Sequence, residues 1–559
     1  MNTNKEIQLT AGQRFWLLLK PDKTEITNLY IYAIFNGLIY LALPLGIQSI
    51  INFIQGGQIS SAWVLLVTVV LVAIIISGVI TIFQMRITEN LQQKIFSRSA
   101  FEFAFRLPRI TEAIKNKLYL PELSNRFFET IAIQKGLPKL LISFTSSIVQ
   151  IVFGLAVLAF YHPFFILFIL FSFLVVYILF RFTVKPGLKT SLEESSHKYK
   201  LIFWLQEIAR SANSFKSAGF SDLPMTKTNK HVADYLDARE RHYQILVRQY
   251  RQLILFKVLI ASGLLAVGGI LVIQQQMNIG QFVAAEIIIL LMMSSVEKLI
   301  LNMSSIYDVL TALEKIGHVT DLELDGERGS LDMNLCTEKG IEIHFEKFEL
   351  MKQDNNANQL QISSLLIRPG QKLLMGGEDE DNRELLFKIL AGNSDRYQGL
   401  LTYCGLALKT ISFEKLKMHI GVYDDQETLF DGTVFENIGM GRENIGLKEV
   451  INAARAVRLD GIIQSRIDGY NTKITAHCNE FSLSTRKKIL LARAIVHRPN
   501  LLAIDFNKLP EDPELRKKLS HMLNNLNDCT LVAIASDANL ITGKKLVVNT
   551  QNGKIEEIN

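Results

Sequence analysis

A short stretch beyond residue 370 has the residue order of a loop that holds a phosphate. A β-like run at 371–375 leads into Gly376 and Gly377, and a helical run at 385–392 follows. Glycines at such a turn let backbone N–H groups surround an anion at the N-terminus of the next helix. The pattern indicates the strand–loop–helix layout of a phosphate-binding loop.

The charges inside this loop oppose that chemistry. Five of the seven residues 378–384 are carboxylates, and Arg383 is their single cation. One like-charge pair at about 4 Å costs about 1 kcal/mol in water and roughly 4 kcal/mol at an effective dielectric constant of 20. We therefore expect weak affinity for phosphates and a solvated acidic loop, with capture of Mg²⁺ as the alternative.

The chain that must position this loop divides into an apolar part and a charged part. Of its 559 residues 49% are hydrophobic; residues 26–85 contain no Asp, Glu, Lys or Arg, whereas the region after residue 330 is charged throughout. This split excludes a wholly soluble protein. The net charge of +6 reflects basic residues beside apolar stretches, so a membrane is the predicted partner and nucleic acid is not.

Three apolar stretches are each long enough for two membrane helices, since one span needs about 20 residues. Polar turns at 55–58, 161–163 and 274–278 divide them, which predicts three hairpins and six spans. Lys and Arg are absent from these turns and frequent in 86–139 and 181–257. The positive-inside rule therefore places both long segments and both termini in the cytoplasm. The expected location of this multi-pass protein is the inner (plasma) membrane of the cell.

Helical periodicity in those two segments predicts that the spans continue as long helices, an arrangement that suits coupling to a soluble motor; unrelated peripheral helices are the alternative. Residues 1–25 are expected to form an interfacial segment. Within the sixth span Glu286 would cost roughly 2.5–3.5 kcal/mol unpaired, so we expect it to face the bundle interior or a wet cavity. A substrate path, an interhelical hydrogen bond and an interfacial position stay open for it.

From residue 340 short β-like runs begin, followed by TLFDGTVFENI at 428–438, LARAI at 491–495 and LLAID at 501–505. In this order they resemble the nucleotide-binding domain of an ABC exporter, and the six spans resemble the transmembrane domain of that family, most of all its type I secretion members. The resemblance implies an α-helical membrane domain at 26–320, a linker at 321–338 and an α/β P-loop NTPase-like domain at 339–559.

The resemblance also assigns site positions, and most have lost the family's residue. In the phosphate loop Gly377 is kept, Asn382, Arg383 and Glu384 replace the second glycine, the lysine and the hydroxyl, and Leu385 follows. Asp505 keeps the position on the Mg²⁺ side, with a plain strand-end carboxylate as the alternative. For Arg383 the alternative to a phosphate clamp is a surface ion pair.

Most of the catalytic positions have also lost the residue that the family has there. Phe506 stands in place of the catalytic Glu, Ser536 in place of the switch His, and Asp425 in place of the Q-loop Gln, although Gln426 leaves that register open. Leu350 replaces a base-stacking aromatic, while Asp512 fits the D-loop Asp. The signature motif corresponds to Phe481, Ser482, Leu483, Ser484 and Thr485, without its two glycines.

The function that the resemblance implies is that of an ABC exporter half-transporter with impaired ATP binding and hydrolysis. It would move a peptide, protein or other large substrate outward, as a homodimer or as a heterodimer with another half-transporter, with a periplasmic adaptor as a further partner. ATP and Mg²⁺ are the family's cofactors, and enzyme activity of this chain alone stays open. No metal site is predicted, because the four cysteines lack zinc-type spacing. The alternative is a non-catalytic scaffold or regulatory membrane subunit.

Overall fold

The computed structural model describes residues 10–40, 42–55, 61–115, 117–219, 221–325, 329–333, 340–351, 360–376, 379–424, 427–475, 480–524, 528–535, 545–549 and 555–558. The chain forms two compact units. One comprises Met1–Pro108 and Leu118–Leu322, and the other comprises Arg109–Lys117 and Glu323–Asn559.

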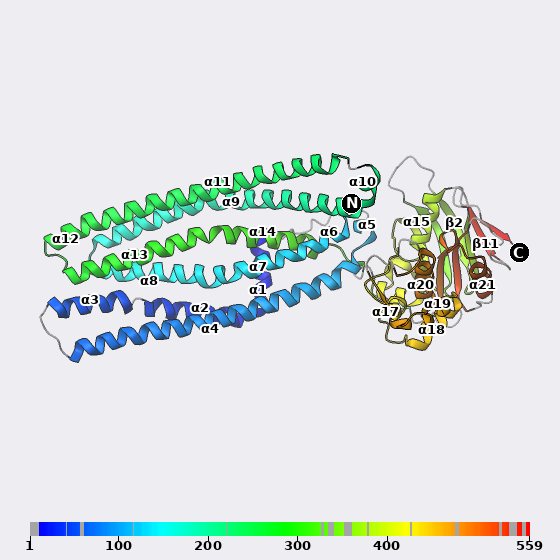
Figure 1. Ribbon diagram of the computed structural model, residues 1–559, viewed down its shortest axis with the longest axis horizontal. Coiled ribbons are helices and arrows are strands. Elements are labelled where there is room, and N and C mark those ends of the chain that lie inside the picture. Colours follow the sequence, from blue (N-terminus) through cyan, green and yellow to red (C-terminus); the bar gives the residue numbers. More distant parts are fainter. Residues whose placement is uncertain are drawn as a thin grey trace. The chain divides into compact units, whose positions relative to one another are not determined.

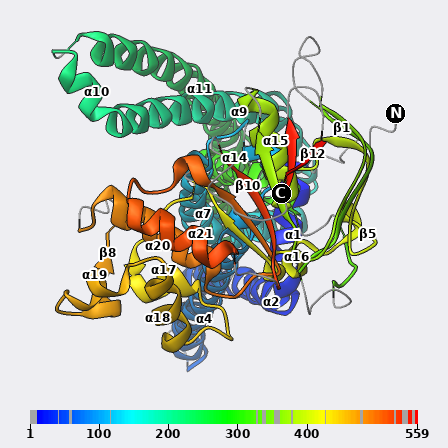
Figure 2. The same cartoon turned by 90° about the vertical axis from the view of Figure 1, so that its right-hand side faces the viewer.

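The first unit is a bundle of long and short α-helices. They are α1 (Ala11–Leu19), α2 (Lys23–Tyr40), α3 (Ala42–Gln55), α4 (Ser61–Arg106), α6 (Leu120–Asn125), α7 (Glu129–Pro138), α8 (Thr145–Tyr161), α9 (Phe164–Arg210), α10 (Ala212–Ser217), α11 (Leu223–Gly263), α12 (Gly269–Ile273), α13 (Ile279–Leu301) and α14 (Met303–Thr320). A π-helical stretch at Lys139–Phe144 joins α7 to α8. In Figures 1 and 2 α9 and α11 lie side by side and meet at α10.

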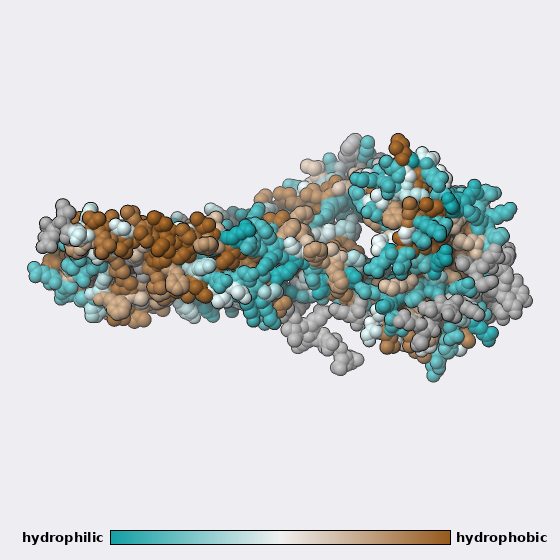
Figure 3. Space-filling view, turned by 90° about the horizontal axis from the view of Figure 1, so that it is seen from below, coloured by the Kyte–Doolittle hydropathy of each residue, from teal (hydrophilic) through white to brown (hydrophobic). Residues whose placement is uncertain are grey.

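Six apolar helical runs in the described part of the chain are long enough to cross a membrane, as predicted. Their surfaces stay apolar where they face outward: Leu65, Ile75 and Leu167 are each at least 65% exposed. On the face that Figure 3 displays, hydrophobic residues gather over the helical unit. An apolar surface of this extent is what lipid covers. The turns predicted near residues 162 and 276 separate helices, while 56–60 lie outside the described residues.

The second unit contains two larger sheets and a two-stranded one. Their strands are β1 (Ile343–Leu350), β2 (Gln361–Ile367), β3 (Lys372–Gly376), β4 (Tyr397–Tyr403), β5 (Leu406–Ala407), β6 (Ile420–Tyr423), β7 (Gly432–Thr433), β8 (Lys473–Ile474), β9 (Leu501–Asp505), β10 (Thr530–Ile534), β11 (Lys545–Asn549) and β12 (Ile555–Ile558). Four strands pair antiparallel in the order β2-β1-β4-β5, and six pair in the order β12-β11-β3-β10-β9-β6. All neighbours in the second sheet are parallel except β11 and β12.

The second unit also contains α-helices. They are α5 (Glu112–Lys115), α15 (Glu380–Leu390), α16 (Phe413–His419), α17 (Val434–Gly439), α18 (Leu447–Ala456), α19 (Asp460–Gln464), α20 (Leu483–Ile495) and α21 (Pro513–Asn524). Alternate residues of β9 enter two separate cores: Leu502 and Ile504 pack with α17, α18 and α20, whereas Leu501 and Ala503 pack with β1 and α15. Figure 2 shows α17–α19 on one side and β1 and β5 on the other.

Residues 109–117 belong to the second unit, although they lie inside the long segment 86–139. Ile110 pairs with Leu324 in an antiparallel bridge, and the Thr111 N–H donates to the Glu323 carbonyl oxygen at 3.3 Å. Arg109 Nη2 lies 2.9 Å from Oε1 of Glu414, which is in the first turn of α16. This short segment is therefore fixed to the α/β unit by backbone and ionic contacts.

Candidate functional site

The carboxyl ends of four parallel strands meet at one edge of the six-stranded sheet. Ile534 at the end of β10 pairs with both Met375 of β3 and Asp505 of β9, and Tyr423 of β6 pairs with Ile504. In open α/β sheets ligands bind outside this edge. The described part of the predicted phosphate loop (379–384) follows β3, and Asp505 ends β9, so the structure brings these predicted site positions to the same edge.

The N-terminus of α15 is capped by the chain's own carboxylate. Asp379 Oδ1 accepts the backbone N–H of Asn382 at 2.9 Å, and its Oδ2 accepts the Asn382 side-chain amide, also at 2.9 Å. Glu380 and Asp381 add negative charge to the first turn. The helix end that would attract a phosphate is thus already complemented by anions. Gly377 lies outside the described residues.

The next three positions of the loop point to structural roles. Glu384 pairs with Lys388 at 2.9 Å along α15. Leu385 packs against the core that contains β1 and β3. Arg383 is half-buried, and its positive charge lowers the pKa of Asp505 against the stronger, opposite effect of burial. Arg383 therefore contributes positive potential at the strand edge.

One lysine is shared by two carboxylates at this edge. Lys508 Nζ lies 3.2 Å from Asp424 Oδ1 and 3.7 Å from Asp505 Oδ2. Asp505 is 6% exposed and Asp424 is 8% exposed, and burial raises the pKa of Asp505. Asp505 Oδ1 also accepts the Asn507 N–H at 3.0 Å. An ammonium thus sits beside Asp505, the strand-end carboxylate to which the resemblance assigns Mg²⁺, and beside its neighbour Asp424.

The sequence reasoning missed Lys508 and Asp424. Neither residue is at a position that the family motifs single out. Asp424 precedes the expected position Asp425, and Lys508 ends a single 3-10 turn, Phe506–Lys508, that follows Asp505. A lysine three residues after a strand-end aspartate is the only signal that could have pointed to the pair. Asp425 and Ser536 lie outside the described residues.

Two further catalytic positions serve the fold. Phe506 is 3% exposed and packs in the core with α17, α18 and α20, so its ring offers no group that could polarise water. Asp512 accepts a hydrogen bond from Lys488 Nζ at 2.8 Å and another from the Leu515 N–H at 3.1 Å, which caps α21. Lys488 lowers the pKa of Asp512.

The signature-like segment begins α20. Ser482 Oγ accepts the Thr485 N–H at 3.2 Å as an N-cap, while Phe481 is buried beneath Arg466, whose guanidinium lies 5.1 Å from the ring centre. Leu483 is 65% exposed, and Ser484 is exposed beside it. Side chains therefore cover the helix end at the two positions where the family has bare glycine.

A buried arginine ties the 428–438 segment to α20. Arg493 Nε donates to the Asn437 carbonyl oxygen at 2.7 Å, its Nη2 donates to Asn437 Oδ1 at 3.1 Å, and its Nη1 donates to the Thr428 carbonyl oxygen at 3.1 Å. Asn437 in turn donates to the Phe430 carbonyl oxygen at 2.9 Å. The 428–438 motif is thus held to α20 by several hydrogen bonds of one buried arginine.

The remaining predicted positions lie elsewhere. Leu350 is fully buried in the core with β1, so it presents no face for stacking a base. In the first unit Glu286 of α13 is half-buried and makes no hydrogen bond or ion pair with the residues that the structure describes. A second acidic residue of α13, Glu297, which was not among the predicted site positions, pairs with Lys257 of α11 at 2.7 Å. Among the described residues no group of three or more His, Cys, Asp or Glu side chains could hold a metal ion.

Comparison with known proteins agrees with this architecture. Residues 360–505 match the family model of ABC transporters. The chain is 27% identical over 253 residues to an ATP-dependent lipid A-core flippase of Saccharophagus degradans, which covers 44% of this chain and 42% of the flippase. It is 25% identical over 252 residues to ABC transporter B family member 2 of Dictyostelium discoideum, which covers 45% of this chain and 18% of that protein.

A solved structure of a bacterial Atm1-family ABC exporter with ATP bound superposes with a TM-score of 0.78 at 15% identity, covering 95% of this chain and 94% of the exporter. The predicted fold class is thereby confirmed: six long apolar helices precede a C-terminal α/β ABC nucleotide-binding domain. The chain spans less than half of the length of the two relatives named above. By family resemblance the matched domain implies ATP and Mg²⁺ as ligands.

Proposed function

We propose that this chain is an exporter half-transporter whose own nucleotide site neither binds ATP tightly nor hydrolyses it. The first part rests on the exporter fold and on the family match within the α/β unit. The second part rests on one observation: Lys508 lies between Asp424 and Asp505, at the strand edge where the family binds the metal-bound nucleotide.

The residues present do not fit ATP with Mg²⁺. At the phosphate side Asp379 takes the N–H of Asn382, and Glu380 and Asp381 surround the same helix end with negative charge. At the metal side the Lys508 ammonium would repel a divalent cation, since like charges at this range cost several kcal/mol when partly buried. The phosphates of the nucleotide thus meet carboxylates, and the metal ion meets an ammonium group.

A dimer with a second half-transporter follows from this proposal. In the family each nucleotide lies between one subunit's phosphate loop and the other subunit's signature segment. A homodimer of this chain would contain two sites with the same defects, so hydrolysis requires a partner with an intact phosphate loop. The exported substrate is a peptide, a protein or another large molecule, and export is outward across the inner membrane.

The test begins with co-purification of the full chain from its native membrane, followed by mass spectrometry. If an intact half-transporter accompanies it, the ATPase activity of the complex should vanish when the partner's phosphate-loop lysine is changed. The same activity should be indifferent to Arg383→Ala in this chain. Leu483→Gly with Ser484→Gly should raise turnover, because side chains would no longer cover the helix end that faces the partner's nucleotide.

Two outcomes would overturn parts of the proposal. Loss of activity in Arg383→Ala alone would mean that this chain's own site is functional. A complex that contains no exporter half and shows no ATP-dependent transport in vesicles would favour a scaffold or regulatory membrane subunit instead.

A further inference from the structure

A polar pocket of about 320 Å³ lies in the first unit between α7, α9 and α14. Each helix contributes side chains spaced three or four residues apart, so a single face of each helix lines the pocket. The volume falls at the low end of small-molecule sites, which span roughly 300–1,000 Å³. A ligand of this size is a small molecule or the end of a longer chain.

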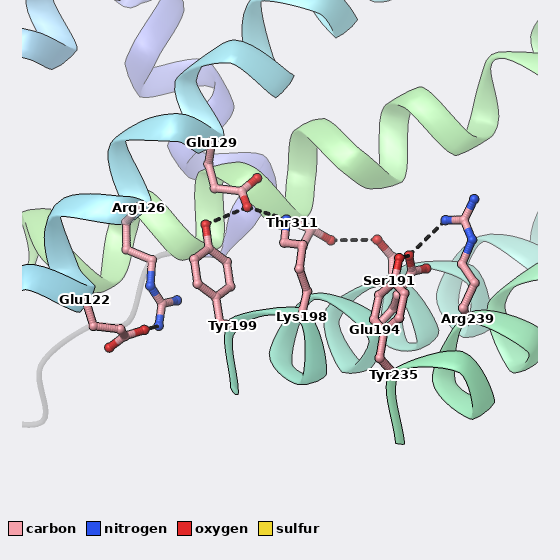
Figure 4. A network of polar contacts seen from close by, with 10 residues as sticks. All are labelled: Glu122, Arg126, Glu129, Ser191, Glu194, Lys198, Tyr199, Tyr235, Arg239 and Thr311. Carbon is pink, nitrogen blue, oxygen red and sulfur yellow. Dashed lines mark hydrogen bonds and ion pairs between the residues drawn. The ribbon is translucent and has the colours of Figure 1, made fainter. Parts of the chain in front are cut away.

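Some charges in the pocket wall are already paired. Glu129 accepts hydrogen bonds from Lys198 Nζ and from the Tyr199 hydroxyl, each at 2.7 Å. Glu194 pairs with Arg239 at 2.8 Å. Figure 4 shows both groups, with Glu129 and Lys198 directed toward each other across the helices. These pairs fix the wall and leave little net charge of their own.

Other polar groups in the wall make no hydrogen bond or ion pair in the described part of the chain, although the charges of Arg239 and Lys198 act on one of them, Asp308. Asp308 of α14 and Lys135 of α7 line the pocket and make no hydrogen bond or ion pair there. Ser195 of α9 is 6% exposed, and its Oγ has no hydrogen-bond partner. A buried hydroxyl without a partner costs about 1–3 kcal/mol, so its position calls for a ligand or water. The pocket therefore offers one negative group, one positive group and one neutral donor or acceptor.

Lys139 strengthens the positive side. Its Nζ donates to Ser305 Oγ at 2.9 Å, which uses one of three ammonium protons and leaves two for a ligand. A simple anion would meet the carboxylates of Glu194 and Asp308, and a simple cation would meet Lys135 and Lys139. A molecule that carries both charges satisfies the two sides together.

We propose that this pocket binds a small zwitterion with a free ammonium and a free carboxylate, such as an amino acid or the termini of a short peptide. The ammonium lies toward Asp308, the carboxylate lies toward Lys135 and Lys139, and Ser195 bonds the backbone between them. The use of this site to select export substrates rests on the proposed function; the binding itself does not.

The experiment measures binding of triglycine to the full chain in detergent by titration calorimetry, without nucleotide. Triglycine should bind, and N-acetyl-triglycine and triglycinamide should each bind at least tenfold more weakly, because a charge-assisted contact is lost. Asp308→Asn should weaken triglycine by a similar factor and leave N-acetyl-triglycine unchanged. Lys135→Gln should weaken the binding of triglycine by a similar factor and leave the binding of triglycinamide unchanged. Asp234→Asn and Lys230→Gln, on α11 outside the pocket, are the matched controls.

Equal affinity for triglycine and its blocked forms, or unchanged affinity in both pocket variants, would overturn the proposal. So would binding of inorganic phosphate that depends on Lys135 alone, which would identify a plain anion site. Asp308→Glu keeps the charge and should keep binding, which separates a lost contact from a misfolded variant. Failure of ATP-driven export with intact triglycine binding would contradict the proposed function and leave this site standing.

Discussion

Lys508 Nζ lies 3.2 Å from Asp424 Oδ1, so the end of β9 is joined to the end of β6 by an ion pair at the ligand-binding edge of the sheet. The same ammonium is 3.7 Å from Asp505 Oδ2. Both carboxylates are buried, and Lys508 is a cation that they share. The pair thus gives a structural role to carboxylates that could otherwise bind a metal.

Lys508→Met should destabilise the α/β unit, because two buried carboxylates lose their cation; the expected loss is about 1–3 kcal/mol. Mg²⁺ should then raise the melting temperature of the variant and not that of the parent chain, because the strand edge becomes available to a divalent ion. Calorimetric melting of the full chain measures both effects. Lys517→Met, exposed on α21, is the control. An unchanged melting temperature in Lys508→Met would contradict the shared ion pair.

Arg493→Met should cost about 3–5 kcal/mol, since it removes a buried cation together with the hydrogen bonds that it donates to the Asn437 carbonyl oxygen and Oδ1. Arg455→Met is the matched comparison: its pair with Asp460 is largely exposed on the arginine side and should contribute less than about 1 kcal/mol. Hydrogen exchange in peptides from β9 reports the stability of this unit. Similar protection in both variants would show that the network around Arg493 does not carry the fold.

Burial lowers the pKa of His497 to about 4 from an ordinary 6.5. Between these values the unfolded chain binds more protons than the folded one, so the stability of the α/β unit should fall as the pH falls from 6.5 toward 4. His497→Leu should flatten that dependence by removing the titrating ring. Calorimetric melting at several pH values checks it; an equally steep decline in the variant would assign the pH dependence to other groups.

Ile110→Cys with Leu324→Cys should form a disulfide on mild oxidation, since the two residues face each other in an antiparallel bridge. Ile110→Cys with Glu342→Cys, which the bridge does not bring together, is the control. Mass spectrometry of the full chain under non-reducing conditions measures the cross-link. Its absence in the first variant would mean that residues 109–117 are not fixed to the α/β unit.

The six spans and the order of domains could be predicted because each depends on local composition. An apolar run without charged residues predicts a membrane helix when it is long enough to span the bilayer. The strands that lead to Gly376 and Asp505 are short apolar runs, which predict β-strands. The acidic composition of the loop before α15 could also be seen in the sequence. That Asp379 caps the N-terminus of this helix could not.

The ion pair of Lys508 could not be predicted in the same way. Its partner Asp424 is 84 residues away along the chain, and neither residue belongs to a motif. Only the parallel register of β6 and β9 brings them together. The pocket between α7, α9 and α14 has the same origin, because helix packing alone places Lys135 and Asp308 on its wall.

Titration of ATP with Mg²⁺ into the purified full chain, followed by calorimetry, bears most directly on the proposed loss of nucleotide binding. We expect no detectable binding up to about 1 mM, which corresponds to a standard free energy weaker than about −4 kcal/mol. Asp379→Ser combined with Arg383→Lys, Glu384→Ser and Lys508→Met should bring affinity into the measurable range, because it removes the opposing charges. A micromolar dissociation constant for the unaltered chain would contradict the proposal. It would mean that Asp379 and Lys508 do not prevent the nucleotide and the metal from binding.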